Sequence, residues 1–456
     1  MLFQVIRLQF SGEFMQNNED GEQPVSGDVG SKPPASTGAM PQESAWRIRN
    51  FAILAVHHIS LRCGWIFKTE SIIMPAVVDS LGGAAWLRGC LPLLNRFGQS
   101  VPPLLMSGRI KGMAEKKWAM AVCATCMSVC FLTLALVWYG TGQSNHGWMA
   151  PAFLGIYGIF FISTGVYNMT FTTVQGKLVQ TNRRGRLLLI SNLVGAVVAI
   201  VSAALLLPLW LQPGEEQFGL IFGFSGVMFA IAALLSLLLA EPRDDFSRDA
   251  RPSRLLQQAV GVLRRDRDFR RLALIGALFG TCFTLFPHYQ SIGRGLFPDQ
   301  GLNVLISWVM VQNGGTACAS LVAGPLADRF GNRLALRVLL LLICVAPFLT
   351  LALRILGPEF RESYNVVFIL VGLTPTFFRI INNFTLELSK PEDHPVYIST
   401  LSLCIAAPAI TSPLVGLVVD RAGFAPVFLT IGSVLVFAWL LTFTLSEPRH
   451  DADNEL

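Results

Sequence analysis

The sequence predicts an all-α multi-pass membrane protein with twelve transmembrane helices in two pseudo-symmetric six-helix bundles. Of its 456 residues, 52% are hydrophobic and only 14% are charged, whereas a typical soluble domain has about 25% charged residues. About twelve apolar stretches are long enough to cross a membrane as a helix, which takes about 20 residues. One polar stretch, residues 241–271, divides these stretches six and six.

The expected spans follow one another through short loops. They cover approximately residues 50–78, 84–107, 117–140, 148–175, 187–211, 218–240, 272–297, 303–327, 334–356, 363–389, 396–419 and 424–446.

The chain accordingly divides into five regions. These are a disordered cytoplasmic tail (1–49), an N-terminal bundle (50–240), a cytoplasmic central loop (241–271), a C-terminal bundle (272–446) and a cytoplasmic tail (447–456). The first tail is rich in Gly, Pro, Ser, Asn and acidic residues, which is typical of disorder. Within the central loop, Ser253 to Val262 is expected to form a short helix on the membrane surface.

The distribution of Lys and Arg predicts the orientation. The loops after the second, fourth and eighth spans and the central loop are rich in these residues, whereas the loop after the third span has none. Because short cytoplasmic loops carry the excess of Lys and Arg, both termini are expected in the cytoplasm. We expect the protein to lie in the cell inner membrane.

Motifs of soluble enzymes are absent from the sequence. There is no GxxxxGK[ST] loop, no GxGxxG motif opening a βαβ unit and no HExxH pair. Cys123, Cys126 and Cys130 share one helix face, but no His or acid lies nearby to complete a metal site. We therefore expect no enzyme activity, no cofactor, no metal and no nucleic-acid partner, and interpret these cysteines as small packing residues.

The two halves resemble each other at their basic loops. The stretch GRIKGMAEKK (108–117) follows the second span, and GPLADRFGNR (324–333) follows the second span of the other half. Two six-helix repeats of the same orientation fit a transporter built from two related bundles. Glycines Gly324 and Gly331 are expected to allow a close helix approach and a tight turn. The turn VVDRAG (418–423) is interpreted as structural.

The decapeptide Gly324–Arg333 resembles the G-x-L-a-D-r-x-G-r-[KR] loop of the major facilitator superfamily. Together with the twelve spans and the repeat, it identifies the chain as similar to a bacterial branch of these transporters over about residues 50–446. The resemblance implies rocker-switch alternating access, with Asp328 and Arg329 in a cytoplasmic latch. The first half departs from the pattern, because Gly112 stands where the second half has Asp328, unless Glu115 substitutes.

Arginines within the spans mark candidate substrate sites, because ionisable residues are costly in a bilayer and commonly functional. At ~1.5 Å per helical residue, Arg62 lies about 18 Å from the start of span one, and Arg379 about 16 Å from the corresponding end of span ten. Arg96 of span two also falls near mid-depth. An arginine-lined pocket favours an organic anion, since the guanidinium matches carboxylate and phosphate. The alternative is that Arg62 and Arg96 pair with Glu70 or with helix carbonyls as internal struts.

In the family's arrangement, spans 1, 4, 7 and 10 line the cavity. Further substrate-binding candidates are therefore Tyr167, Asn168, His288, Tyr289 and Asn383. For proton coupling the candidates are Glu70 and His288, although a single histidine in a helix is commonly just a hydrogen-bonded structural group.

The predicted function is secondary active transport of a small solute, because the chain contains no ATP-binding module. The partners expected are the small-molecule substrate, membrane lipids and a coupling proton or other ion, with the protein as a monomer. The alternative is a non-transporting membrane sensor or lipid-handling protein on the same scaffold, because a fold does not fix a function.

Overall fold

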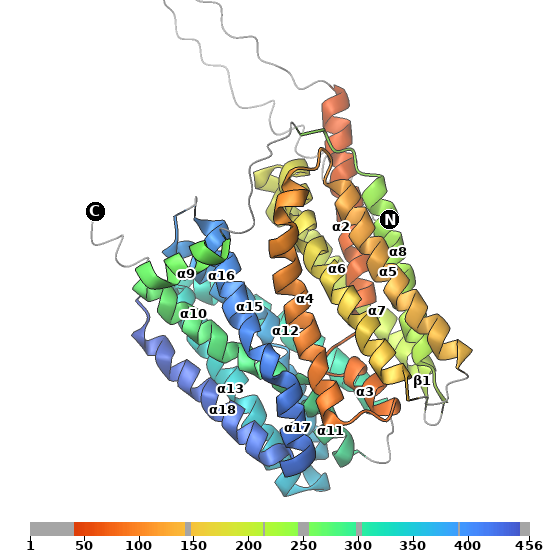
Figure 1. Ribbon diagram of the computed structural model, residues 1–456, viewed down its shortest axis with the longest axis vertical. Coiled ribbons are helices and arrows are strands. Elements are labelled where there is room, and N and C mark those ends of the chain that lie inside the picture. Colours follow the sequence, from red (N-terminus) through yellow and green to blue (C-terminus); the bar gives the residue numbers. More distant parts are fainter. Residues whose placement is uncertain are drawn as a thin grey trace, which may run out of the picture. The chain divides into compact units, whose positions relative to one another are not determined.

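A computed structural model describes residues 41–141, 147–212, 215–244, 255–297, 303–390 and 393–446. Residues Trp46–Leu456 form one compact unit, and the arrangement below concerns that unit. Figure 1 shows its helices in two groups.

The first group has the helices α2 (Pro41–Ile66), α3 (Ile73–Ser80), α4 (Ala85–Lys111), α5 (Lys117–Gly140), α6 (Met149–Leu178), α7 (Thr181–Trp210) and α8 (Phe218–Leu237). A two-stranded antiparallel ladder connects α7 to α8. Its strands are β1 (Leu211–Gln212) and β2 (Glu215–Glu216), and Leu211 pairs with Glu216.

The second group follows the polar stretch, in which α9 (Leu255–Arg265) forms a short helix where the sequence predicted one. The group contains α10 (Arg267–Gly280), η2 (Thr281–Leu285), α11 (Phe286–Leu296), α12 (Asn303–Phe330), α13 (Asn332–Leu356), η4 (Pro358–Tyr364), α14 (Asn365–Val371), α15 (Thr374–Leu388), α16 (His394–Ala406), η5 (Ala407–Thr411), α17 (Ser412–Ala422), α18 (Phe424–Leu441) and η6 (Thr442–Thr444).

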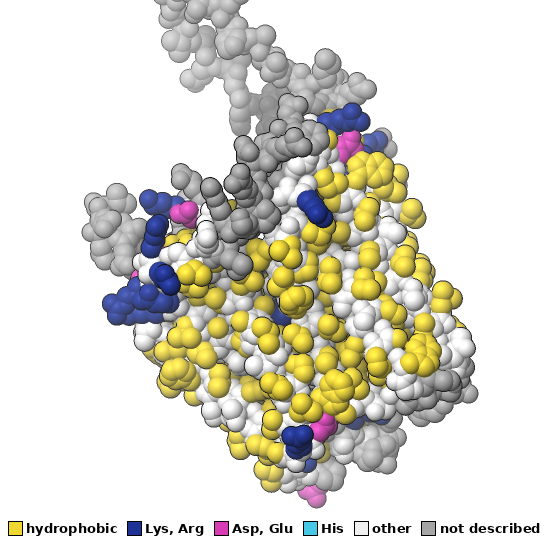
Figure 2. Space-filling view, viewed as in Figure 1, with side chains coloured by type: hydrophobic (Ala, Val, Ile, Leu, Met, Phe, Trp, Pro, Cys, Tyr) yellow, Lys and Arg dark blue, Asp and Glu magenta, His cyan; other side chains and the backbone are white. Residues whose placement is uncertain are grey.

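Among the described residues, ten helical stretches are long and apolar enough to cross a membrane, and they coincide with the expected spans three to twelve. The first two expected spans are also helical, as α2 with α3 and as α4. Both carry arginines within their length, which lowers their apolar content. Figure 2 shows hydrophobic side chains over the middle of the visible face and Lys and Arg gathered toward its upper edge.

Several spans are broken by short 3-10 turns or by proline. In span seven, α10 gives way to η2 before α11, and in span ten α15 begins with Pro375 at its first turn. Such breaks free backbone carbonyls that hydrocarbon cannot satisfy. Threonine hydroxyls donate hydrogen bonds to carbonyls at these breaks. Thr281 donates to Leu278 O at 2.7 Å, and Thr374 donates to Val371 O at 2.7 Å.

The two groups repeat the same packing. In the first, α5 lies along α8 and α4 along α6; in the second, α13 lies along α18 and α12 along α14. Between the groups, α4 packs on α17 and α12 packs on α7. The first contact joins span two to span eleven, and the second joins span eight to span five. The two contacts are equivalent under the repeat, so the repeat seen weakly in the sequence is present in the packing.

Glycines set equivalent close approaches in both halves. A Cβ on Gly165 of α6 would lie 2.2 Å from Gly98 O of α4, and one on Gly372, between α14 and α15, would lie 2.3 Å from Gln312 O of α12. Real atoms do not approach so closely, so these positions exclude a side chain. In contrast, a Cβ on Gly324 would meet nothing within 4 Å. The close approach expected at Gly324 is therefore wrong, whereas Gly331 does form the expected turn, with φ of 86°.

At one end of the unit, here called the closed end and made by residues 79–89 and 412–420, the two groups are in backbone contact. A Cβ on Gly416 of α17 would lie 2.3 Å from Ala85 O of α4. Helix α4 has Ala84 as its N-cap, which offers no capping side chain. Asp420 of the other group supplies the cap, accepting from Ala85 N–H at 2.9 Å and Trp86 N–H at 3.2 Å. The VVDRAG turn thus joins the two groups and is more than a local turn.

At the opposite end, here called the basic end and made by residues 108–117, 177–186, 241–244 and 324–333, acidic residues hold the N-terminal group together. Glu241 is fully buried, accepts from Lys117 N–H at 2.7 Å and pairs with Lys177 at 3.1 Å. Hydrogen bonds from Lys116 and Lys177 hold the pKa of Asp244 below its usual value. The ionised Asp244 therefore adds to the free energy of unfolding near neutral pH. This contribution is lost as the pH falls through the lowered pKa of Asp244.

We expect the variant Gly165→Ala to lose about 1–3 kcal/mol of stability, because its methyl group overlaps the α4 backbone. Thermal melting of the detergent-solubilised protein measures the loss. The matched control is Gly155→Ala on the same helix, where a Cβ meets nothing within 4 Å. Equal melting temperatures for the two variants would contradict the packing described.

Candidate functional site

A cavity of about 940 Å³ lies between the two groups of helices. Its walls come from α2, the α2–α3 connection, α5, α6 and α7 on one side and from α11, α12 and α15 on the other. The volume is at the upper end of the range for small-molecule sites. Its polar lining residues are His58, Arg62, Lys68, Thr69, Glu70, Ser71, Tyr167, Asn168, Asn192, Gln312, Asn313, Thr316, Ser320 and Arg379.

Arg62 projects from α2 and is held by α7. Its Nη1 donates to Asn192 Oδ1 at 3.1 Å. A Cβ on Gly195, one turn further along α7, would lie 3.1 Å from Arg62 Cδ. The absence of a side chain at Gly195 therefore makes room for the arginine.

Arg379 projects from α15, in the opposite group. Its Nη2 donates to Ser320 Oγ at 2.7 Å, and Ser320 lies 3.1 Å from the Thr376 hydroxyl. Both arginines thus have neutral hydrogen-bond partners. Neither forms an ion pair with a carboxylate in the part of the chain that the structure describes. The structure brings these two predicted residues to one cavity.

Glu70, a predicted proton carrier, lies in the connection between α2 and α3. It pairs with Lys68 at 3.1 Å, and the amide of Asn95 also donates to its carboxylate. Lys68 is only 1% exposed, and its ammonium lies 3.8 Å from the centre of the Trp65 ring and 4.3 Å from that of Phe161. The charge of Glu70 is therefore balanced within the cavity wall.

Arg96, predicted as a substrate residue, is not among the residues that line the cavity. Its Cζ lies 3.4 Å from the centre of the Phe283 ring, which belongs to the other group of helices. The guanidinium thus forms a cation–π contact across the interface. Among the described residues, the Arg96 guanidinium forms no ion pair with Glu70, and its Nε has no hydrogen-bond partner.

His288 and Tyr289 also lie outside the cavity. Span seven presents Phe286 to the cavity, whereas His288 and Tyr289 are not among the residues that line it. The His288 ring lies 6.2 Å from that of Phe424, and Tyr289 O accepts from the Tyr364 hydroxyl at 2.7 Å. Asn383 is exposed one turn beyond Arg379 and does not line the cavity.

Tyr167 and Asn168 of α6 both line the cavity as predicted. The Tyr167 side chain is 4% exposed, and its hydroxyl lies 2.5 Å from His57 Nε2. The sequence offered no reason to join His57 to Tyr167, because their helices are adjacent only in the folded chain.

The predicted gating loop lies at the basic end, between α12 and α13. Asp328 and Arg329 are both exposed. The Arg329 Cζ lies 5.4 Å from the centre of the Phe330 ring. Arg333 donates to Leu445 O at 3.1 Å and so ties α13 to the end of span twelve.

One wall of the cavity was missed by the sequence interpretation. Helix α12, which is span eight, contributes Gln312, Thr316 and Ser320, and α7 contributes Asn192. Gln312, Thr316 and Ser320 recur at intervals of four, which is one helix face. That polar stripe in an apolar span was a signal for a second lining helix.

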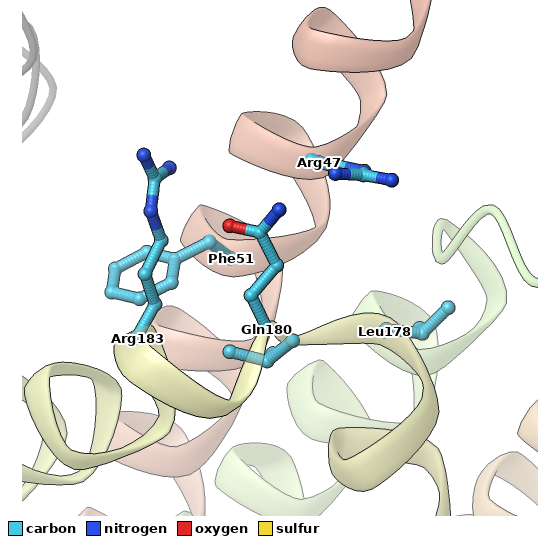
Figure 3. Close-up of a pocket in the computed structure, with 6 residues that line it drawn as sticks. Arg47, Phe51, Leu178, Gln180 and Arg183 are labelled. Carbon is cyan, nitrogen blue, oxygen red and sulfur yellow. The ribbon is translucent and has the colours of Figure 1, made fainter. Parts of the chain in front are cut away.

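A second pocket, of about 20 Å³, lies at the basic end between α2 and the α6–α7 connection. Its volume suffices for about one water molecule. Figure 3 shows that the guanidinium groups of Arg47 and Arg183 point apart. We therefore regard the large cavity as the candidate site.

Comparison with known proteins finds a family model and solved structures that this chain resembles. Residues 297–456 match the family model for the Major Facilitator Superfamily. A search of curated protein sequences finds no match. Among solved structures, a mutant of the nucleoside transporter NupG is similar with a TM-score of 0.69 and 13% identity, over 86% of this chain and 99% of that one.

Two sugar transporters share the fold as well. The D-xylose–proton symporter gives a TM-score of 0.60 at 13% identity, over 87% of this chain and 98% of that one. The E. coli fucose:proton symporter FucP gives 0.54 at 15% identity, over 88% and 100%. At such identities the similarity establishes the fold. The family model thus matches the C-terminal bundle, and the solved structures show that the chain has the fold of these transporters.

Proposed function

We propose that the protein is a secondary transporter that moves a small organic anion through the central cavity, with Arg62 and Arg379 binding the anionic group. The observation that carries this proposal is the absence of a carboxylate partner for either guanidinium in the described structure. Two arginines from opposite bundles face one cavity. A bound carboxylate or phosphate would give both guanidinium groups a charged partner.

The charge of the cavity wall supports an anion over a neutral or cationic solute. Lys68 and Glu70 cancel one another, which leaves the charges of Arg62 and Arg379. Buried charges are stable only when paired and hydrogen-bonded. Because the guanidinium forms strong two-point contacts with carboxylate and phosphate, an anion is the ligand that this wall favours.

We propose transport by rocker-switch alternating access. Asp420, Gly416 and the α4–α17 contact keep one end of the cavity shut. The excess of Lys and Arg at the opposite, basic end supports a cytoplasmic location for that end, on the inner face of the cell inner membrane. In the alternate state the closed end would part, and the exposed Asp328 and Arg329 would latch the basic end.

We propose that a proton accompanies the substrate, as in the two sugar symporters of similar fold. Glu70 is the predicted carrier that reaches the cavity, whereas His288 does not line it. The protein is proposed to work as a monomer in contact with membrane lipids.

A ligand screen on the purified protein tests the anion site. We expect succinate, benzoate or glucose 6-phosphate to raise the melting temperature of the wild type, and succinamide and glucose to leave it unchanged. In Arg62→Ala or Arg379→Ala the affinity should fall ~10- to 100-fold, because a hydrogen bond to a charged group contributes about 1.5–3 kcal/mol.

The control for that screen is Arg264→Ala, which removes an exposed arginine of α9 outside the cavity. Anions that stabilise all three variants equally would exclude the two-arginine site. Uptake of the stabilising anion into proteoliposomes separates transport from sensing, since a sensor would bind the anion without moving it.

The variant Asp420→Ala tests the closed end. Loss of an N-cap costs about 1 kcal/mol, so the closed end should open roughly 5-fold more often. Hydrogen–deuterium exchange of the first turn of α4, at Ala85 and Trp86, measures this opening. In Arg421→Ala, which alters an exposed neighbour, exchange should match the wild type, and a similar result for Asp420→Ala would show that the cap does not hold this end.

A further inference from the structure

His57 lies behind the cavity wall and has a defined tautomer. It is fully buried in α2, and its Nδ1 lies 2.8 Å from Ala232 O of α8. A carbonyl oxygen only accepts hydrogen bonds, so Nδ1 carries the hydrogen in this network. Nε2 is therefore the nitrogen with the free lone pair.

Tyr167 connects this lone pair to the cavity. Its hydroxyl lies 2.5 Å from His57 Nε2 and must be the donor there. The two rings are stacked, with centroids 5.7 Å apart, and Phe171 stacks on both. Tyr167 is one of the residues that line the cavity, and its hydroxyl hydrogen is directed to His57.

We propose that His57 is the proton-binding group of the transporter and that Tyr167 couples its protonation to anion binding, which rests on the proposed anion transport. One proton binds at Nε2, which then donates to the Tyr167 oxygen. The hydroxyl hydrogen of Tyr167 turns into the cavity and donates to the anion. No covalent bond other than the new N–H is made, and loss of the proton reverses each step.

The surroundings of His57 make this coupling strong. The groups that face His57 and Tyr167 are His58 of α2, Cys123 of α5 and the hydroxyl of Ser236 of α8, which lies 3.4 Å from Nδ1. Arg62 of α2 lies near His58. No carboxylate pairs with His57 among the residues described. An imidazolium here lacks a counter-ion until an anion enters, so each ligand favours the other.

The two proton carriers predicted from the sequence are less well placed for this role. Glu70 is already held by Lys68 and Asn95. His288 is buried outside the cavity and has no hydrogen-bond partner for either ring nitrogen in the described structure. Of these three groups, His57 is the one joined to a residue of the cavity wall through a hydroxyl.

Proton uptake on anion binding tests the inference. Succinate, benzoate and glucose 6-phosphate are each added to detergent-solubilised protein in weak buffer with a pH indicator. We expect the wild type to take up one proton per bound anion, and anion affinity to fall as the pH rises. In His57→Gln and Tyr167→Phe the uptake should drop ~10-fold or more, whereas His288→Gln, a buried histidine outside the cavity, should behave as wild type.

The possible results distinguish the role of His57 from the anion site. Anion binding with unchanged proton uptake in both His57→Gln and Tyr167→Phe would overturn the role of His57 and leave the anion site standing. Loss of uptake in Glu70→Gln, with retention in Tyr167→Phe, would assign the proton to Glu70. Tyr167→Phe keeps the inference testable if His57→Gln does not fold. If none of the three probes binds the wild type, the anion proposal and this inference both fail.

Discussion

The rest of the structure depends on one constraint: a polar group inside a bilayer must find its partner within the protein. Broken spans satisfy it with threonine hydroxyls on freed carbonyls, as Thr281 and Thr374 do. Lys68 satisfies it with Glu70 and an aromatic cage. Arg62 and Arg379 have only neutral partners, whereas Lys68 of the same cavity wall is paired with a carboxylate.

The same constraint explains how the two bundles meet. Within each bundle, glycines bring helices into backbone contact where hydrocarbon supplies no other attraction, as at Gly165 and Gly372. Between the bundles, Asp420 caps the start of α4 from the other half. A contact of a few hydrogen bonds costs little to break, so the rigid bundles and the breakable contact between them form a suitable frame for alternating access.

The candidate site combines a fixed charge with an adjustable one. Two arginines supply a constant positive wall, and the Tyr167 hydroxyl donates to His57 Nε2, which in the proposed coupling binds one proton. Because Tyr167 belongs to the cavity wall and His57 does not, proton and anion occupy different positions and are linked through one hydroxyl. Such a link gives coupling without contact between the two ligands.

By itself, the sequence determined the fold class, the repeat, the basic end and the presence of arginines at the depth of the cavity, because hydropathy, charge bias and helical rise are local properties. It did not determine which face of each span meets the cavity. Arg96 packs on Phe283, His288 and Tyr289 turn into their own bundle, and α12 supplies a wall instead. The tertiary structure alone decided these positions, together with the His57–Tyr167 and Asp420–α4 contacts, because each depends on how helices distant in sequence are rotated against one another.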